Sequence, residues 1–169
     1  MMRRNKHLWT VAVAAVATAC SSSAPGPTDP PRVCTLIGCE DGLRVDLDPA
    51  ASWPAGAYVF TIEADTARAT CRGSLPLPPC AAGPAIVCDP TGLVTVAESG
   101  CALPAGAQGF PQLRFDPKAR PRKVVVTVAR NDAVVARAEL SPEFQKTQPN
   151  GPGCAPTCEQ SQARIVVRF

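Results

Sequence analysis

Sulfur is the element through which this chain can do the most chemistry, because it has nine cysteines but only one histidine, His7. Eight of the cysteines form an even set: Cys34, Cys39, Cys71, Cys80, Cys88, Cys101, Cys154 and Cys158. An even set in an exported chain is typical of a disulfide framework. Spacing leaves many pairings open, and we expect two clusters. Cys34 and Cys39 would pair with Cys154 and Cys158, and the four central cysteines would pair among themselves.

Metal binding and histidine-based catalysis are poorly supported by the residue types present. Structural zinc sites use cysteines about two to four residues apart, or cysteine with histidine. Cys154 and Cys158 have suitable spacing, but Cys34 and Cys39 make a poor second pair. The sequence has no Cys-x-x-Cys motif and no glycine-rich phosphate loop between a strand and a helix. We therefore predict no catalytic residue, no metal and no cofactor, and we expect that the protein is not an enzyme.

Acidic residues gather in two short segments, CEDG with Glu40 and Asp41, and DLDP with Asp46 and Asp48. Asp46 and Asp48 would share one face of a strand that continues through Leu47. Clustered carboxylate oxygens are ligands that calcium prefers, so this pair is a weak candidate for a binding site. The alternative is a solvated strand edge. A hydrolase that uses two acids would instead need converging, buried carboxylates with raised pKa values.

Trp53 is the other weak candidate for ligand binding, in the segment SWPAGAYVF. A sugar-binding surface uses an exposed aromatic ring, whereas a ring that closes a corner of the core is mostly buried. The exposed fraction of Trp53 separates these two interpretations, and we favour the buried one.

The first residues are typical of a signal peptide. Arg3, Arg4 and Lys6 precede an uncharged apolar run, Leu8 to Ala19, which is shorter than the roughly 20 residues that a membrane-spanning helix needs. We therefore assign residues 1–19 to a signal peptide. The following residues, SSSAPGPTDPP, are rich in serine and proline and cannot bury enough apolar surface to fold.

The four residues ATAC, which end at Cys20, resemble the lipobox of bacterial lipoproteins. The resemblance implies that Cys20 carries a diacylglycerol and a further acyl chain such as palmitate. Residues 20–32 would then be a lipidated tether. Ser21 follows the cysteine, where family members kept in the inner membrane often have aspartate, so the resemblance implies outer-membrane sorting. The alternative is an ordinary secreted protein, cleaved near Ala19, in which Cys20 is a plain thiol.

The charge balance argues against a nucleic-acid partner. The chain has 17 basic and 14 acidic residues, for a net charge of +3. Arg3, Arg4 and Lys6 would leave with the signal peptide, and the remaining charges then balance, which excludes a chain-wide basic footprint. The one basic concentration is RFDPKARPRK, Arg114 to Lys123. It is either a phosphate-binding loop or, as we favour, a charged loop that protects the next strand.

Short alternating segments between prolines and glycines predict an all-β fold. In the segment YVFTIEA, Tyr58, Phe60, Ile62 and Ala64 would lie on one face, with Thr61 and Glu63 on the other. The segment RKVVVTVARNDAVVARAEL predicts a hairpin that turns at Asn131-Asp132. In that hairpin Val124, Val126 and Val128 would form one face, and Val134, Ala136, Ala138 and Leu140 the returning one. The segments 73–85 and 100–112 would be loops. We predict one antiparallel β-sandwich, Ig-like in architecture, with eight or nine short strands over residues 33–169.

These features together predict a lipid-anchored outer-membrane protein on the periplasmic or cell-surface side. Its composition is similar to that of cysteine-rich outer-membrane lipoproteins of Gram-negative bacteria. We expect a non-enzymatic structural or interaction module. Its partners would be the membrane, through the lipid, and an envelope protein or glycan. The alternative is a glycan- or calcium-dependent binding module.

Overall fold

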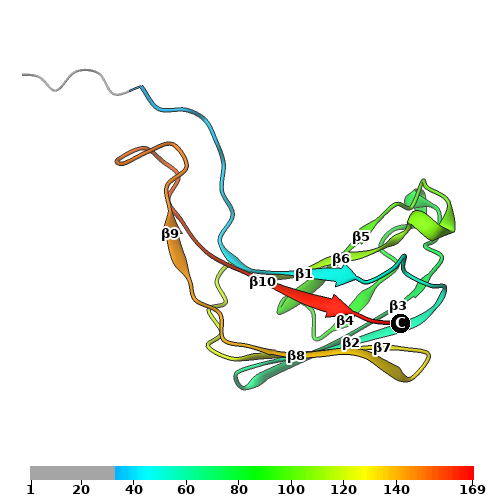
Figure 1. The fold of residues 1–169 in the computed structure, drawn as a ribbon. Helices are drawn as coiled ribbons and strands as arrows, with labels where there is room; N and C mark the ends of the chain where they lie inside the picture. The colour runs from blue at the N-terminus through cyan, green and yellow to red at the C-terminus, as the bar shows by residue number, and fades with distance from the viewer. Residues whose placement is uncertain (1–32) are drawn as a thin grey trace, which may run out of the picture. The chain divides into compact units, whose positions relative to one another are not determined.

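Ten strands arranged in two sheets account for 51% of the residues described by the computed structural model, which are residues 33–169 (Figure 1). The predicted signal peptide, Cys20 and the tether lie outside the described residues. Cys34–Phe169 forms one compact unit. No helix among the described residues has the length and apolar character needed to cross a bilayer.

The first sheet contains both ends of the domain. Its strands, in spatial order, are β5 (Val94–Ser99), β6 (Gly109–Phe115), β1 (Gly42–Pro49), β10 (Cys158–Val167) and β9 (Gln145–Thr147). The second sheet consists, in order, of β4 (Val87–Asp89), β3 (Ala67–Leu75), β2 (Gly56–Ala64), β7 (Val124–Arg130) and β8 (Ala133–Leu140). Two short 3₁₀ helices, Cys80–Ala82 and Ala105–Ala107, lie in the connections. The strand count exceeds the predicted eight or nine because β4 and β9 have only three residues each.

The prediction of a purely antiparallel fold is wrong at one pair of strands. β1 and β10 pair in parallel, from Gly42 opposite Gln160 to Pro49 opposite Val167. A parallel pair needs a long connection between its strands, and here the connection contains the eight other strands. Residue patterns within each strand carry no information about this direction. The pair places the first and last strands side by side in the middle of the first sheet (Figure 1).

The predicted hairpin forms around Asn131 and Asp132, whose φ angles of 47° and 67° suit a tight turn between strands. Val124, Val126 and Val128 are fully buried, as expected. The returning strand, β8, differs from the prediction, because a register shift between Val128 and Ala129 interrupts the β7–β8 ladder. The extra residue turns Val134 outward, with 63% of its surface exposed, and brings Val135 against the core.

The predicted loop 100–112 is partly wrong, because β6 begins at Gly109. Pro111 is tolerated in this strand, since β6 pairs with β1 only from Gln112 onward and β5 is irregular between Ala97 and Ser99. Gly109 is required by a close approach: a Cβ atom there would lie 2.4 Å from Cδ1 of Trp53. The predicted loop 73–85 likewise begins with the end of β3, which continues to Leu75.

Buried side chains from both sheets form one core, which includes Tyr58, Phe60 and Phe110. Trp53 lies 5.5 Å from the ring of Phe110 in an edge-to-face arrangement. Phe169, the last residue, contacts the Trp53 ring from outside at 5.5 Å and stays 43% exposed. It therefore covers the aromatic cluster and does not fill the core.

Four disulfides cross-link the domain in the two expected clusters. They are Cys34–Cys154, Cys39–Cys158, Cys71–Cys88 and Cys80–Cys101. The first two join residues 120 and 119 positions apart and tie the segment before β1 to the loop before β10 and to the first residue of β10. The other two close short loops around β3, β4 and β5. All eight cysteines of the described part are thus paired with one another.

Val126 and Val134 provide a matched test of the core, because the same substitution can be made on neighbouring strands. Val126→Ala should lower the free energy of unfolding by about 2 kcal/mol, since Val126 is fully buried. Val134→Ala should change it by less than about 0.5 kcal/mol, since that side chain is largely exposed. Denaturant titration of the oxidised protein measures both values. Equal losses would contradict the placement of Val134.

The two long-range disulfides should contribute to stability non-additively. While one of them is intact, the other closes only a loop of about ten residues, so replacing either pair by alanine should cost about 2–3 kcal/mol. Replacing both opens the full loop and should cost about 2 kcal/mol more than the two single losses together. Denaturant unfolding measures this coupling in the two variants that each lack one long-range disulfide and in the variant that lacks both. Strict additivity would contradict the nested arrangement.

Candidate functional site

Asp46 is positioned on the outer face of the first sheet by the alternation of β1, which buries Leu43, Val45 and Leu47 on the opposite face. Both of its carboxylate oxygens accept hydrogen bonds from amides of neighbouring strands. Gln112 Nε2 donates to Oδ1 at 2.8 Å, and Gln162 Nε2 donates to Oδ2 at 2.7 Å.

These hydrogen bonds decide the ionisation of Asp46. They come from Gln112 first and Gln162 second, and they hold the pKa of Asp46 below its ordinary value, with help from the charges of Arg164 and Arg44. Partial burial acts in the opposite direction and is outweighed. Asp46 is therefore suited to staying ionised, and a general acid of a hydrolase would need the reverse.

The calcium interpretation of Asp46 and Asp48 gains no support from this geometry. The strand continues through Leu47, as expected, so both acids lie on one face. Asp46 already receives two amide donors, however, and Asp48 lies 3.5 Å from Nη1 of Arg164. Among residues 33–169, no group of three or more acidic, histidine or cysteine side chains is placed to hold a metal ion.

Trp53 belongs to the core, since only 7% of its surface is exposed. Its ring is surrounded by those of Tyr58, Phe110 and Phe169. The exposed aromatic ring that a sugar platform needs is therefore not provided by Trp53, and the interpretation as a corner of the core is the correct one.

A polar groove runs along β10 where the chain crosses from the second sheet to β9. Its volume is about 580 Å³, and β10 contributes Gln160, Ser161, Gln162 and Ala163. The opposite wall consists of Leu140, Ser141, Pro142, Glu143, Gln145 and Thr147, and Arg44 reaches in from β1. Gln160 Nε2 donates to Thr147 Oγ1 at 2.9 Å and so links the walls at one end. We call this feature the β10 groove.

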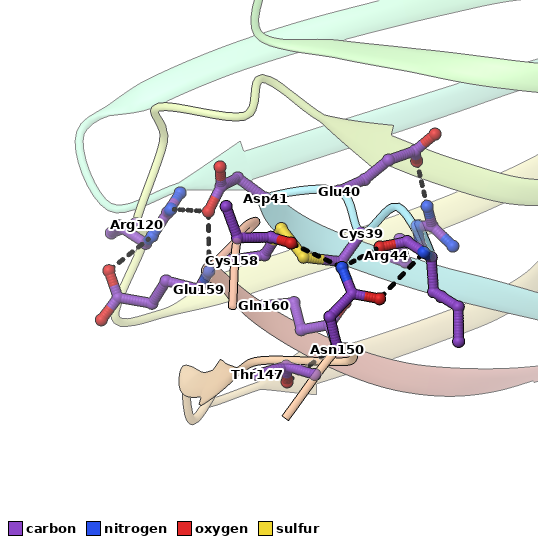
Figure 2. Close-up of a disulfide and its surroundings, with 12 residues drawn as sticks. Cys39, Glu40, Asp41, Arg44, Arg120, Thr147, Asn150, Cys158, Glu159 and Gln160 are labelled. Atoms are coloured by element: carbon purple, nitrogen blue, oxygen red, sulfur yellow. Dashed lines mark hydrogen bonds and ion pairs between the residues drawn. A yellow bond between two sulfur atoms is a disulfide. The ribbon is translucent and has the colours of Figure 1, made fainter. Parts of the chain in front are cut away.

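A second hollow, about 520 Å³ in volume, shares Arg44, Thr147 and Gln160 with the β10 groove. Its remaining wall includes Cys39 and Glu40 of the segment before β1. Figure 2 shows these side chains around the Cys39–Cys158 disulfide, with Glu40 paired to Arg44. The covalent bond therefore holds the wall of this hollow in place.

Asn150 fixes the same segment through both ends of its side-chain amide (Figure 2). Its Oδ1 accepts the backbone N–H of Ile37 at 2.9 Å, and its Nδ2 donates to the carbonyl of Ile37 at 3.0 Å. Nδ2 also donates to the carbonyl of Ala155. One asparagine thus joins the segment before β1 to the loop before β10, between the two long-range disulfides.

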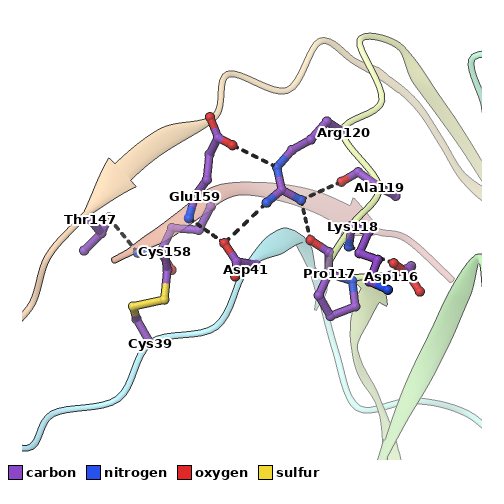
Figure 3. A network of polar contacts seen from close by, with 11 residues as sticks. Cys39, Asp41, Asp116, Pro117, Lys118, Ala119, Arg120, Thr147, Cys158 and Glu159 are labelled. Atoms are coloured by element: carbon purple, nitrogen blue, oxygen red, sulfur yellow. Dashed lines mark hydrogen bonds and ion pairs between the residues drawn. A yellow bond between two sulfur atoms is a disulfide. The ribbon is translucent and has the colours of Figure 1, made fainter. Parts of the chain in front are cut away.

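Arg120 forms the third connection, from the β6–β7 loop (Figure 3). Its Nη2 lies 3.3 Å from Asp41 and its Nε 3.4 Å from Glu159, and its guanidinium stacks 5.1 Å above the ring of Phe144. Asp41 also accepts the backbone N–H of Glu159 at 2.7 Å. Arg120 donates in addition to the carbonyls of Pro117 and Ala119. The acids of this cluster serve structure and are paired, which leaves no converging pair for hydrolysis here.

Most basic side chains of the segment 114–123 already have partners within the molecule. Arg114 Nε donates to Gln112 at 2.8 Å, and Lys123 pairs with Glu139 at 2.6 Å. The backbone N–H groups of Arg122 and Lys123 both donate to the carboxylate of Asp65. These contacts agree with the favoured interpretation of a charged loop.

Sequence reasoning missed the residues that build this region. Asn150 and Arg120 lie in loops with no periodicity, and their contacts with Ile37 and Glu159 join residues 113 and 39 positions apart. The glutamines of β10 had a weak signal, since CEQSQARIVV alternates and places Gln160 and Gln162 on one face. That they border a groove depends on the path of the β8–β9 connection, which no local pattern reveals.

The lowered pKa of Asp46 leads to a direct prediction. Gln112→Ala or Gln162→Ala should raise the pKa of Asp46 toward its ordinary value, because each removes one amide donor to the charged carboxylate. The carboxyl carbon resonance of Asp46, followed by NMR from neutral to acid pH, measures this. Since the folded-state pKa is depressed, the stabilisation by Asp46 is present above its unfolded pKa and is lost as the pH falls through the folded value. An unchanged pKa in both variants would contradict the assigned cause.

Comparison with known proteins gave no relative: no family model, no curated protein and no solved structure matches this chain.

Proposed function

We propose that this chain is a lipid-anchored protein of the outer membrane, attached through Cys20, and that its cross-linked domain is a non-enzymatic interaction module. The observation that carries the proposal is the pairing of cysteines. All eight cysteines of the described part bond to one another, so none of them is left as a partner for Cys20. Four disulfides are also characteristic of a compartment outside the cytoplasm. The resemblance of ATAC to a lipobox then gives the thiol of Cys20 a role as the site of acylation.

The domain architecture that we propose is an Ig-like sandwich. Two five-stranded sheets and one shared core support it. The parallel pairing of β1 with β10 is a variation at the strand that opens the domain. Such a frame suits display, because its rigid sheets hold loops and grooves in fixed positions.

The β10 groove is the surface that we assign to partner binding. Small-molecule pockets are mostly lined by apolar and aromatic side chains, but this groove is lined largely by amide, hydroxyl and charged groups. Such a lining is suited to a ligand that itself carries many hydrogen-bonding groups. A protein segment and a glycan both meet this requirement.

Glycan binding is the second candidate, favoured by one observation. Gln145, Gln160 and Gln162 place three side-chain amides around one groove, and amides both donate to and accept from sugar hydroxyls. Calcium-dependent binding has less support, because the oxygens of Asp46 are already hydrogen-bonded.

Metabolic labelling with radioactive palmitate in a Gram-negative host tests the anchor. The unaltered chain should incorporate label and fractionate with the outer membrane, because two or more acyl chains hold a protein durably in a bilayer. Cys20→Ser should lose the label and leave the membrane fraction. Ser21→Asp should keep the label but move to the inner membrane, as the lipoprotein resemblance implies.

Ser23→Ala is the matched control, since it lies outside the four residues of the resemblance and should behave as the unaltered chain. Label retained in Cys20→Ser would overturn the proposed anchor. Loss of label in Ser23→Ala would show that the assay reports export and not acylation.

A further inference from the structure

One edge of β10 is left unpaired along most of its length. β9 pairs with β10 only at Cys158, Glu159 and Gln160. The strand continues to Val167, and in the described part of the chain no strand forms a ladder with this edge beyond Gln160. In Figure 1 the short β9 lies at the beginning of the red β10 arrow.

The backbone groups that face this edge can be identified from three hydrogen bonds. The N–H of Glu159 donates to Asp41, and the carbonyl of Val167 accepts from Ala50, so both residues point toward β1. The N–H of Arg168 donates to the carbonyl of Val135 in β8, so it points the other way. Successive residues of a strand alternate in direction. Gln162 and Arg164 therefore direct their N–H and C=O groups away from β1, toward the open edge.

The open edge and the β10 groove coincide. Gln160, Ser161, Gln162 and Ala163 line the groove, and its far wall is the connection from β8 to β9. A volume of about 580 Å³ accommodates a few residues of extended chain. A strand placed there would have its backbone against Gln162 and its alternate side chains toward Leu140 and the polar rim.

The outermost strands are protected against such pairing, and β10 is not. β4 and β9 have three residues each, and a proline follows β4 directly at Pro90. β5 is irregular between Ala97 and Ser99, and the β7–β8 ladder has its own shift. Beyond Gln160, the edge of β10 shows no such feature: residues 161–167 continue as a regular strand without proline.

We propose that the β10 groove binds an extended polypeptide segment of a partner protein, which adds to β10 as a new strand through the backbone of Gln162 and Arg164. The segment carries no acidic side chain. Two charged residues line the groove, and Arg44 is already paired with Glu40, whereas Glu143 has no ion pair among the described residues and would repel a second carboxylate. This inference rests on the proposed role as an interaction module and names its partner class.

Binding of synthetic peptides to the full chain in detergent micelles tests the proposal. The probes are fluorescent peptides of about nine residues with blocked ends, in which threonine alternates with alanine or serine with valine. The competing probe is a soluble N-acetylglucosamine oligosaccharide. Fluorescence anisotropy should detect saturable binding of at least one peptide, and the oligosaccharide should not displace it.

Two substitutions at Gln162 separate backbone recognition from side-chain recognition. Gln162→Pro removes the N–H that faces the groove and should weaken peptide binding by about tenfold. Gln162→Ala keeps that N–H and should leave binding within about twofold. Ala163→Pro tests whether the backbone N–H groups of β10 alternate in direction, because the N–H of Ala163 faces β1. That variant should unfold at a lower denaturant concentration than Gln162→Pro.

A measurement on the unaltered chain covers the case in which Gln162→Pro does not fold. Addition of peptide should slow hydrogen exchange at the amides of Gln162 and Arg164, with little change at Ser161 and Ala163. The proposal is overturned if no peptide binds at millimolar concentration. It is also overturned if Gln162→Ala weakens binding as much as Gln162→Pro, or if the oligosaccharide displaces the peptide, since the groove then recognises side-chain ligands.

Self-association is the remaining outcome. If sedimentation shows a dimer that Gln162→Pro dissociates, the edge is occupied by a second copy and the proposal of a separate partner fails. None of these results depends on lipidation. Palmitate labelling and membrane fractionation of Gln162→Pro should match the unaltered chain, so failure of this inference is distinguishable from failure of the proposed anchor.

Discussion

The parallel pairing of β1 with β10 is the interaction on which the other features of the domain depend. It joins the first and last strands in the centre of the first sheet, and so connects the β5–β6 side of that sheet to β9. The contacts around its beginning all reinforce this pair. Two disulfides, the amide of Asn150 and the guanidinium of Arg120 connect the segment before β1 to residues just before or within β10.

This reinforcement explains why so many polar residues at one end of the domain are structural. Asp41 and Glu159 are acids that sequence patterns leave available for chemistry, yet both are held by Arg120. The polar residues of the β10 groove differ from them. They surround a space that another molecule can enter, and they lie where β9 ends its pairing with β10. The space for the proposed partner strand therefore arises from the short length of β9.

Local patterns predicted the parts of the fold that depend on neighbouring residues. The valines of β7, the turn at Asn131 and the burial of Trp53 follow from alternation, turn chemistry and ring size, and all three are observed. The grouping of cysteines into an outer and a central set also agrees with the prediction.

Errors occurred where segments distant in the sequence decide the structure. The direction of β1 relative to β10, the exposure of Val134 and the start of β6 each depend on a partner strand or a bulge. The amide ligands of Asp46 come from strands 66 and 116 residues away, so an acidic pair that suggests calcium in isolation is already satisfied in the fold.

The Cys34–Cys154 bond has a mechanical consequence. Cys34 lies eight positions before the start of β1, and its sulfur is joined covalently to the far end of the chain. A pull on Cys34 is therefore divided between the backbone that leads to β1 and the sulfur bridge that leads to β10, and Cys39–Cys158 divides it again. Both strands of the parallel pair take up such a load together, so the force does not peel one strand from the other.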